Sequence, residues 1–417
     1  MSKLFYKFKN FLKERTGPGL ITGVSDDDPS AIFTYSLAGA RSGFDFLWTS
    51  LLTLPLMYNI QEICARLALI TKRGLLSLIK YLFGYKIAFL IAILLFSANT
   101  FNLASNINAI SLILNYIFPF IPIWLYSLLI SLLMFLIILV FSYKKIFSLL
   151  KFLAFFIFSY IFLIFFVKIN WVEALKSFFF PSIKLTEDYL FILVAILGTT
   201  ISPYMFFWQE EQELEEINHK KNLNIKREVK IIRSDTFIGM LISNVIMFFI
   251  ILTTGQILFY DQKIYNIESL DQLLMVLNPL FGKYSFLFFS LGFIAVGLMT
   301  IPILAGGAAY VFAELFNIKA TFDKKTFDAF PFYVFILISL IFANFFNIFN
   351  LNPLKMLFYS SIIYGFLAPF LIYIILKIGE SSVMKNFKIS KFNKIVGYFT
   401  FYIMLFSLCM LLLSLIF

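Results

Sequence analysis

The sequence predicts an all-α integral membrane protein with about eleven membrane-spanning helices. Three observations lead to this fold class. Of the 417 residues, 61% are hydrophobic and only 14% are charged, whereas soluble proteins average about 25% charged residues. The apolar residues form repeated runs of about 20, the length that a helix needs to cross the hydrocarbon layer. The lysines and arginines gather between alternate runs, as they do in cytoplasmic loops of membrane proteins.

The apolar runs are expected to be helices, because a helix satisfies its own backbone hydrogen bonds in lipid. They cover, to within about three residues, 18–40, 44–68, 84–114, 120–141, 146–168, 187–212, 234–260, 284–314, 328–346, 353–378 and 395–416. With the N-terminus in the cytoplasm, most of the 34 basic residues fall in inside segments. The net charge of +11 therefore indicates topology and not a nucleic-acid partner. We expect a basic cytoplasmic N-terminus (1–17), a single transmembrane domain (18–417) and a C-terminus outside.

Two of the runs are interrupted by proline. The first breaks within 25–30, which contains three aspartates and Pro29, and the sixth breaks within 198–203, which ends at Pro203. Proline removes a backbone donor and disfavours helix at the preceding residue. Discontinuous helices at corresponding positions of two five-helix halves indicate an inverted-repeat transporter with a site near the midplane. We expect repeat one over 18–168, repeat two over 187–378 and an extra helix over 395–416. Two proline kinks without function are the alternative.

The aspartates in the first break are candidate cation ligands. An aspartate at the centre of a membrane helix costs about 2.5–3.5 kcal/mol, and no lysine or arginine lies in the apolar body of the first or sixth run. Hard divalent cations prefer carboxylate, carbonyl and water oxygens. We expect Asp28, directly before the proline, to bind the ion. Asp26 and Asp27 are expected along the ion pathway, with an aqueous vestibule lacking direct contact as the alternative.

Two further groups of polar residues are assigned to the ion pathway. Asn99, Asn102 and Asn106 share one face of the third span. They are expected to form the wall of a hydrated path or, alternatively, to make interhelical hydrogen bonds. The sixth run ends in a stretch rich in glutamate. Most of this stretch is expected to be a solvated helix end, while Gln209 and Glu213, one turn apart, are expected to line the inner exit.

The residues around both breaks resemble those of the NRAMP divalent-metal transporters, which have the LeuT fold. The segment 17–43 is similar to the family's first helix, and its Asp-Pro-Gly-Asn motif falls on Asp28-Pro29-Ser30-Ala31. The segment 198–203 is similar to the region before the family's Met-Pro-His. The resemblance implies an ion surrounded by the Asp28 carboxylate, the carbonyls of Ser25 and Thr199, and Ser202, with Ala31 at the wall.

Three departures from the family pattern affect the expected ion. The family's asparagine, methionine and histidine are replaced by Ala31, Ser202 and Tyr204, and amides stand where the third helix of the family has acids. Losing the thioether removes a preference for soft metals, and Mg²⁺ tends to keep several waters in a wider site. The Asp-Asp-Asp-Pro-Ser form is similar to the NRAMP-related magnesium transporter branch. The missing histidine and acids also remove the usual proton relay.

We therefore expect a transporter of Mg²⁺, or of Mn²⁺, in a bacterial inner membrane, without proton coupling. The ion is cargo, so no resident cofactor is expected, and we expect a monomer whose partners are the ion and the lipid bilayer. One alternative is a proton-coupled Mn²⁺/Fe²⁺ importer. Another is a LeuT-fold amino-acid transporter, which three aspartates disfavour. An enzyme is not expected, because the sequence lacks His-Glu-x-x-His, a Ser/His/Asp set and a glycine-rich phosphate loop.

Overall fold

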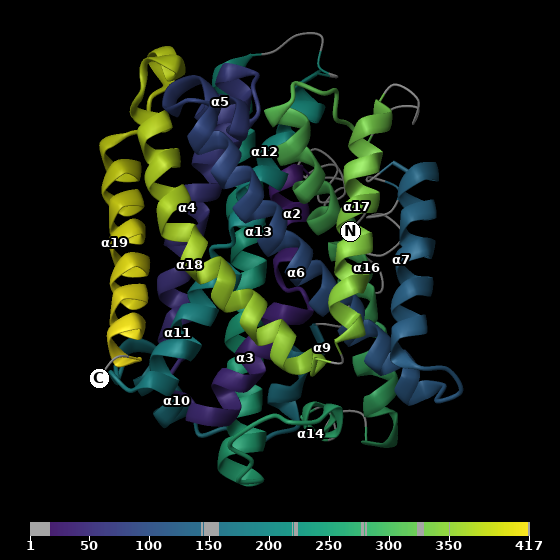
Figure 1. Cartoon of the computed structure of the whole chain (residues 1–417). Helices are drawn as coiled ribbons and strands as arrows, with labels where there is room; N and C mark the ends of the chain where they lie inside the picture. The colour runs from purple at the N-terminus through teal and green to yellow at the C-terminus, as the bar shows by residue number, and fades with distance from the viewer. Residues whose placement is uncertain are drawn as a thin grey trace, which may run out of the picture.

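The computed structural model describes residues 17–142, 145, 158–218, 220, 224–276, 279, 282–322, 329–349 and 351–415. Within these ranges the regular structure is helical and contains no strand. The longer helices are α2 (Pro18–Asp26), α3 (Pro29–Ser42), α4 (Leu47–Thr71), α6 (Tyr85–Ile117), α7 (Ile123–Val140), α11 (Glu187–Thr200), α12 (Pro203–Asn218), α13 (Ile225–Thr254), α16 (Ser285–Leu315), α17 (Phe330–Ile348), α18 (Pro353–Glu380) and α19 (Lys391–Ser414). The shorter ones are α5 (Leu75–Phe83), α9 (Ser159–Phe162), η2 (Leu163–Phe165), α10 (Trp171–Phe179), η3 (Gly255–Asp261), α14 (Leu270–Met275), η4 (Gly282–Tyr284) and η6 (Ser382–Phe387). Figure 1 shows these helices as one bundle, with α7 and α19 at opposite edges.

Most of the predicted spans correspond to long helices. Eight segments of the described chain are long and apolar enough to cross a membrane: α6, α7, α11 with α12, α13 with η3, α16, α17, α18 and α19. The predicted second span is α4, which contains the buried polar residues Asn59, Gln61, Glu62 and Arg66. The fifth predicted span lies mainly outside the described residues, as does the basic N-terminal segment 1–16. The sixth continues beyond its predicted end at residue 212, because α12 runs to Asn218.

Both predicted breaks are present. Helix α2 ends at Asp26 and α3 begins at Pro29, so that Asp27 and Asp28 stand between two half-helices. Helix α11 ends at Thr200 and α12 begins at Pro203. Proline is accepted at the first turn of a helix, where its missing N–H has no helical partner. The Asp28 side chain caps α3 by accepting a hydrogen bond from the Ala31 N–H.

The half-helices that precede the two breaks are held by close glycine contacts. A Cβ added to Gly23 of α2 would lie 2.2 Å from the carbonyl carbon of Gly239 in α13. A Cβ added to Gly198 of α11 would lie 2.1 Å from the Ser361 carbonyl oxygen in α18. Small residues let helix backbones approach closely within membranes. The chain therefore supports each interrupted helix with an uninterrupted neighbour.

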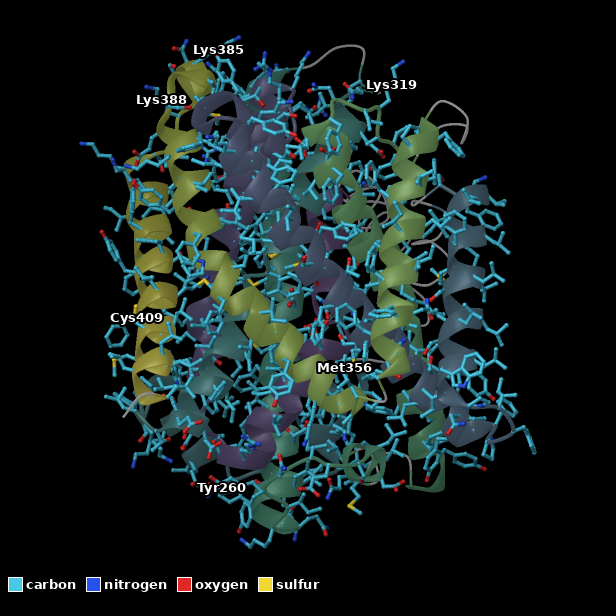
Figure 2. The ribbon with its side chains drawn as sticks, in the orientation of Figure 1. Tyr260, Lys319, Met356, Lys385, Lys388 and Cys409 are labelled. Atoms are coloured by element: carbon cyan, nitrogen blue, oxygen red, sulfur yellow. The ribbon has the colours of Figure 1, made fainter. Side chains whose placement is uncertain are left out.

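One end of the bundle carries the lysines that follow α16 and α18. Figure 2 places Lys319, Lys385 and Lys388 at one end and Tyr260 at the other. The last turn of α19 lies at the end opposite these lysines (Figure 1). We call the lysine-bearing end the basic end. Its separation from the C-terminal end of α19 agrees with an alternation of loops across the membrane.

Candidate functional site

Asp28 is the centre of a buried polar cluster. Its Oδ1 accepts hydrogen bonds from Ser30 Oγ at 2.5 Å and from the Ala31 N–H at 2.8 Å. Its Oδ2 accepts from Asn102 Nδ2 at 3.2 Å and from Asn106 Nδ2 at 3.1 Å. The side chain is 1% exposed. Four neutral donors therefore converge on one carboxylate and stabilise a negative charge at this position.

The asparagine face of α6 makes interhelical hydrogen bonds, which was one of the two interpretations of the sequence. Asn102 and Asn106 bond Asp28, and Asn99 Oδ1 accepts a hydrogen bond from the Tyr364 hydroxyl at 2.9 Å. Asn106 Oδ1 is buried and has no hydrogen-bond partner within the described ranges. The Asn106 side chain therefore donates to Asp28 and still has an acceptor oxygen that could bind a cation or a water molecule.

At the second break, the Ser202 side chain makes hydrogen bonds to backbone carbonyls of the same segment. The Ser202 hydroxyl contacts the carbonyl oxygens of Gly198 at 2.8 Å and Thr199 at 2.5 Å. Tyr204 packs against Tyr364, with 5.3 Å between the ring centroids. Because Tyr364 also bonds Asn99, a chain of contacts connects the second break to the asparagine face beside Asp28.

Asp26 and Asp27 share a single donor. Ser243 Oγ of α13 lies 2.7 Å from Asp26 Oδ2 and 3.3 Å from Asp27 Oδ1. Asp26 Oδ1, Asp27 Oδ2 and the Ser25 hydroxyl are buried, and the described part of the chain offers them no hydrogen-bond partner. The two carboxylates are at most 1% exposed, so in this conformation neither lies in an aqueous vestibule.

The expectation of a solvated glutamate-rich helix end is wrong. Helices α2, α4 and α16 pack around α12. As a result Gln209, Glu210, Glu211 and Glu213 are all buried. Gln209 Nε2 donates to Thr236 Oγ1 at 2.9 Å, while none of the described residues gives its Oε1 a hydrogen bond. Gln209 and Glu213, expected at the inner exit, are therefore enclosed in this conformation.

Sequence reasoning missed one acidic residue of this region. Glu314, near the end of α16, brings a carboxylate oxygen within 4.8 Å of those of Glu210 and Glu211. Its position at the end of a predicted apolar span was the available signal. A single charge at a span end is commonly solvated, so the signal was weak without the tertiary contact.

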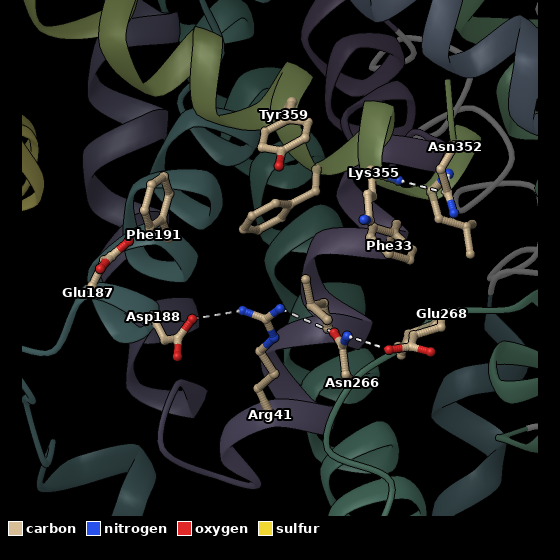
Figure 3. A pocket seen from close by; sticks show the side chains of 14 residues that line it. Phe33, Arg41, Glu187, Asp188, Phe191, Asn266, Glu268, Asn352, Lys355 and Tyr359 are labelled. Carbon is tan, nitrogen blue, oxygen red and sulfur yellow. Dashed lines mark hydrogen bonds and ion pairs between the residues drawn. The ribbon is translucent and has the colours of Figure 1, made fainter. Parts of the chain in front are cut away.

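A cavity lies beside the last turn of α3 and the first turn of α11 (Figure 3), toward the end of the bundle where Figure 1 shows α14. Its volume is about 580 Å³, and its walls come from α3, α11, α18 and the segment before α14. Arg41 Nη1 lies 3.3 Å from Asp188 Oδ1, and Arg41 Nη2 donates to Asn266 Oδ1 at 3.2 Å. Phe33, five residues after Asp28, lines the cavity. The cavity therefore extends toward the first break.

The family profile described as natural resistance-associated macrophage protein-like, Nramp, matches residues 19–414. The chain belongs to this family. It is 24% identical over 401 residues to the divalent metal cation transporter MntH of Caldanaerobacter subterraneus, over 94% of this chain and 90% of that protein. The predicted family is thus confirmed.

Solved structures support the predicted fold. The manganese transporter of Eremococcus coleocola, crystallised with an aromatic bis-isothiourea compound, is similar at a TM-score of 0.77, with 18% identity over 98% of this chain and 88% of that one. Mhp1, a nucleobase-cation-symport-1 family transporter, is similar at 0.53, with 10% identity over 96% and 93%. The LeuT-type fold with broken first and sixth helices is therefore confirmed. The repeat boundaries and the magnesium branch stay predictions.

Proposed function

We propose that the chain transports a divalent metal cation across the membrane, with Asp28 as the anionic ligand. One observation carries the proposal: a fully buried carboxylate stands between two half-helices, and none of the described ion pairs joins it to lysine or arginine. The names of the relatives, a divalent metal cation transporter and a manganese transporter, support the same class of cargo.

The proposed ligands are oxygen atoms from both breaks. They are the Asp28 carboxylate, the carbonyls of Ser25 and Thr199, and the Ser202 hydroxyl, with Ala31 at the wall. A discontinuous helix frees backbone carbonyls that can coordinate a cation. Ser202 contacts the Thr199 carbonyl, so binding through both requires the hydroxyl to turn away from the backbone. The proposed pathway consists of Asp26, Asp27, the asparagine face of α6, Tyr204, Gln209 and Glu213.

We propose Mg²⁺ as the preferred ion. Ser202 and Ala31 offer no thioether and occupy little volume, and hard oxygen ligands with retained waters suit Mg²⁺. Mn²⁺, carried by a proton-coupled importer, is the second candidate, because the named relatives include a manganese transporter. Relatives this distant can differ in cargo, and the ligand substitutions favour Mg²⁺.

We also propose transport without proton coupling. The phenol of Tyr204 is a poor proton carrier at neutral pH, and the amides of α6 do not titrate. A membrane potential of 100 mV contributes about 4.6 kcal/mol for a divalent ion, which suffices to concentrate it. The chain is proposed to lie in a bacterial inner membrane as a monomer, with the N-terminus and the basic end cytoplasmic and the C-terminus outside.

Uptake into proteoliposomes tests these proposals. Mg²⁺, Mn²⁺ and Ca²⁺ are offered side by side at fixed membrane potential, with a pH-sensitive dye inside. We expect Mg²⁺ uptake to be fastest and the internal pH to stay constant. A metal-dependent pH change that disappears in Asp28→Asn would return the protein to the proton-coupled class. Faster uptake of Mn²⁺ than of Mg²⁺ would overturn the assignment of the ion.

A further inference from the structure

Three buried glutamates form a second acidic cluster, away from the first break. Glu210 and Glu211 belong to α12 and Glu314 belongs to α16, and one carboxylate oxygen of each lies within 4.8 Å of the others. Glu210 is fully inaccessible and Glu211 is 8% exposed. We call these three residues the glutamate cluster. Their like charges repel at this separation unless protons or a cation compensate them.

The N-terminus of α5 compensates only part of this charge. Glu210 Oε2 accepts a hydrogen bond from the Leu75 N–H at 2.9 Å, and Glu314 Oε2 accepts one from the Ser77 N–H at 2.7 Å. A helix N-terminus is equivalent to about half a positive charge, against three carboxylates. The Oε1 atoms of Glu210 and Glu314 are buried and have no hydrogen-bond partner among the described residues. Two enclosed oxygen ligands are thus free to bind a cation.

The described basic side chains do not neutralise the cluster. None of the described ion pairs includes Glu210, Glu211 or Glu314. Lys80, on the same short helix as the two N–H donors, instead donates to the Leu315 carbonyl at 2.9 Å.

Gly74 leaves room for the carboxylates at the start of α5. A Cβ added at this position would lie 2.1 Å from Glu314 Oε2 and 2.7 Å from Glu211 Oε1. The absence of a side chain at residue 74 is therefore what permits the glutamates to surround this helix end.

We propose that Glu210, Glu211 and Glu314 bind a hard divalent cation as a second site, distinct from the site at Asp28. Carboxylate oxygens from two helices provide the ligand type that such ions prefer. Glu210 follows Pro203 by seven residues, or about 10 Å along α12. The cluster therefore lies about two turns of α12 beyond the second break. Only the choice of a divalent metal as the bound ion depends on the proposed function.

Counting bound Mn²⁺ tests the second site. The full chain in detergent is titrated with Mn²⁺ alone, and free Mn²⁺ is followed by electron paramagnetic resonance. We expect two ions per chain in the wild type, one in Asp28→Ala, one in the pair Glu210→Gln with Glu314→Gln, and none when all three changes are combined. Loss of all binding in Asp28→Ala, or unchanged binding in the glutamine pair, overturns the second site.

The same titration separates this inference from the proposed function. In one outcome, Asp28→Ala binds as many Mn²⁺ ions as the wild type and the glutamine pair loses Mn²⁺. This result would support the site at the glutamate cluster and exclude the site at Asp28. Gly74→Ala retains every carboxylate yet intrudes on the cluster, so in the Asp28→Ala background it should weaken Mn²⁺ binding at least tenfold. Unchanged affinity in that variant contradicts the proposed geometry.

Glu216→Gln is the matched control for the glutamine pair. Glu216 lies on the same helix but outside the cluster, 3.5 Å from Lys220 Nζ, and is about one-third exposed. This variant should keep both bound ions, because its carboxylate already has a protein cation beside it.

Discussion

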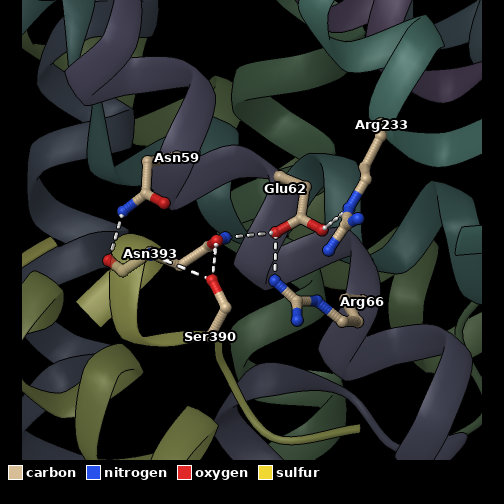
Figure 4. A network of polar contacts seen from close by, with 6 residues as sticks. All are labelled: Asn59, Glu62, Arg66, Arg233, Ser390 and Asn393. Carbon is tan, nitrogen blue, oxygen red and sulfur yellow. Dashed lines mark hydrogen bonds and ion pairs between the residues drawn. The ribbon is translucent and has the colours of Figure 1, made fainter. Parts of the chain in front are cut away.

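Glu62 and Glu210 are both buried glutamates on neighbouring helices, but the protein compensates them differently. Glu62 of α4 has cationic partners: Arg66 pairs with its Oε2, and Arg233 Nε of α13 lies 3.0 Å from its Oε1 (Figure 4). Asn393 Nδ2 of α19 also donates to Glu62, at 3.0 Å. Glu210 has one backbone N–H donor and two carboxylates near it.

The difference shows that burial of a carboxylate does not by itself mark an ion site. The Glu62 network contains its own positive charges, and it connects α4, α13 and α19, so its role is structural. Asp28 accepts hydrogen bonds from four neutral donors. These donors stabilise the negative charge of its carboxylate but do not pair it with a positively charged side chain. A carboxylate that the protein leaves without a cationic partner is the one that an external cation can use.

The largest expected effect is on transport in Asp28→Ala. Removing the anionic ligand should lower divalent-ion uptake by more than about 100-fold, because a mid-membrane cation loses the carboxylate proposed to bind it directly. The midpoint of thermal unfolding should change little, since the loss includes one helix cap worth about 1 kcal/mol. Uptake assays and thermal unfolding of the same preparation measure both. Normal uptake in this variant would exclude Asp28 as the ligand.

The opposite pattern is expected for Glu62→Ala. Arg66 is 4% exposed and would be left as a buried charge without its carboxylate, which costs about 3–5 kcal/mol of stability. Thermal unfolding should show a large loss, and transport per folded molecule should be retained. The double variant Glu62→Met with Arg66→Met should recover most of the stability, because it removes both charges. Equal stability of the single variant and the wild type would make the network dispensable.

A smaller effect is expected on ion preference when Ser202→Met is combined with Ala31→Asn. A thioether binds Cd²⁺ better than Mg²⁺, and the larger side chains leave less room for retained water. We expect the Mg²⁺-to-Cd²⁺ preference to shift by at least tenfold, or about 1.4 kcal/mol. Calorimetric titration with each ion measures the shift. An unchanged preference would mean that other groups determine selectivity.

The smallest effect is expected at the cavity opposite the basic end. Arg41 places a positive charge beside Asp188 at the entrance, so Arg41→Gln should lower the apparent KM for Mg²⁺ by about twofold at low salt. The effect should disappear at high ionic strength. Lys184→Gln is the matched control, because Lys184 is paired with Asp45 at 2.6 Å and does not line the cavity. Equal responses in the two variants would exclude a specific role for Arg41.

Much of the fold and part of the candidate site could be predicted from the sequence. The apolar runs matched most of the long helices, since the hydrocarbon thickness sets their length. The breaks followed from Pro29 and Pro203, which act on the residues directly before them. Asp28 was identified because a charge inside an apolar run is costly wherever the run packs. These signals depend on a few neighbouring residues or on composition, so they can be read without the tertiary structure.

Only the tertiary structure decided which polar groups compensate the acidic ones. The Ser243 hydroxyl lies more than 200 positions from Asp26 and Asp27, and Glu314 lies about 100 positions from Glu210. The burial of the acidic part of α12 likewise depends on α4 and α16. A glutamate at a helix end can be solvated, paired with arginine or enclosed with other acids. The choice depends on which helices pack beside it, because electrostatic compensation acts through space over a few ångströms and not along the chain.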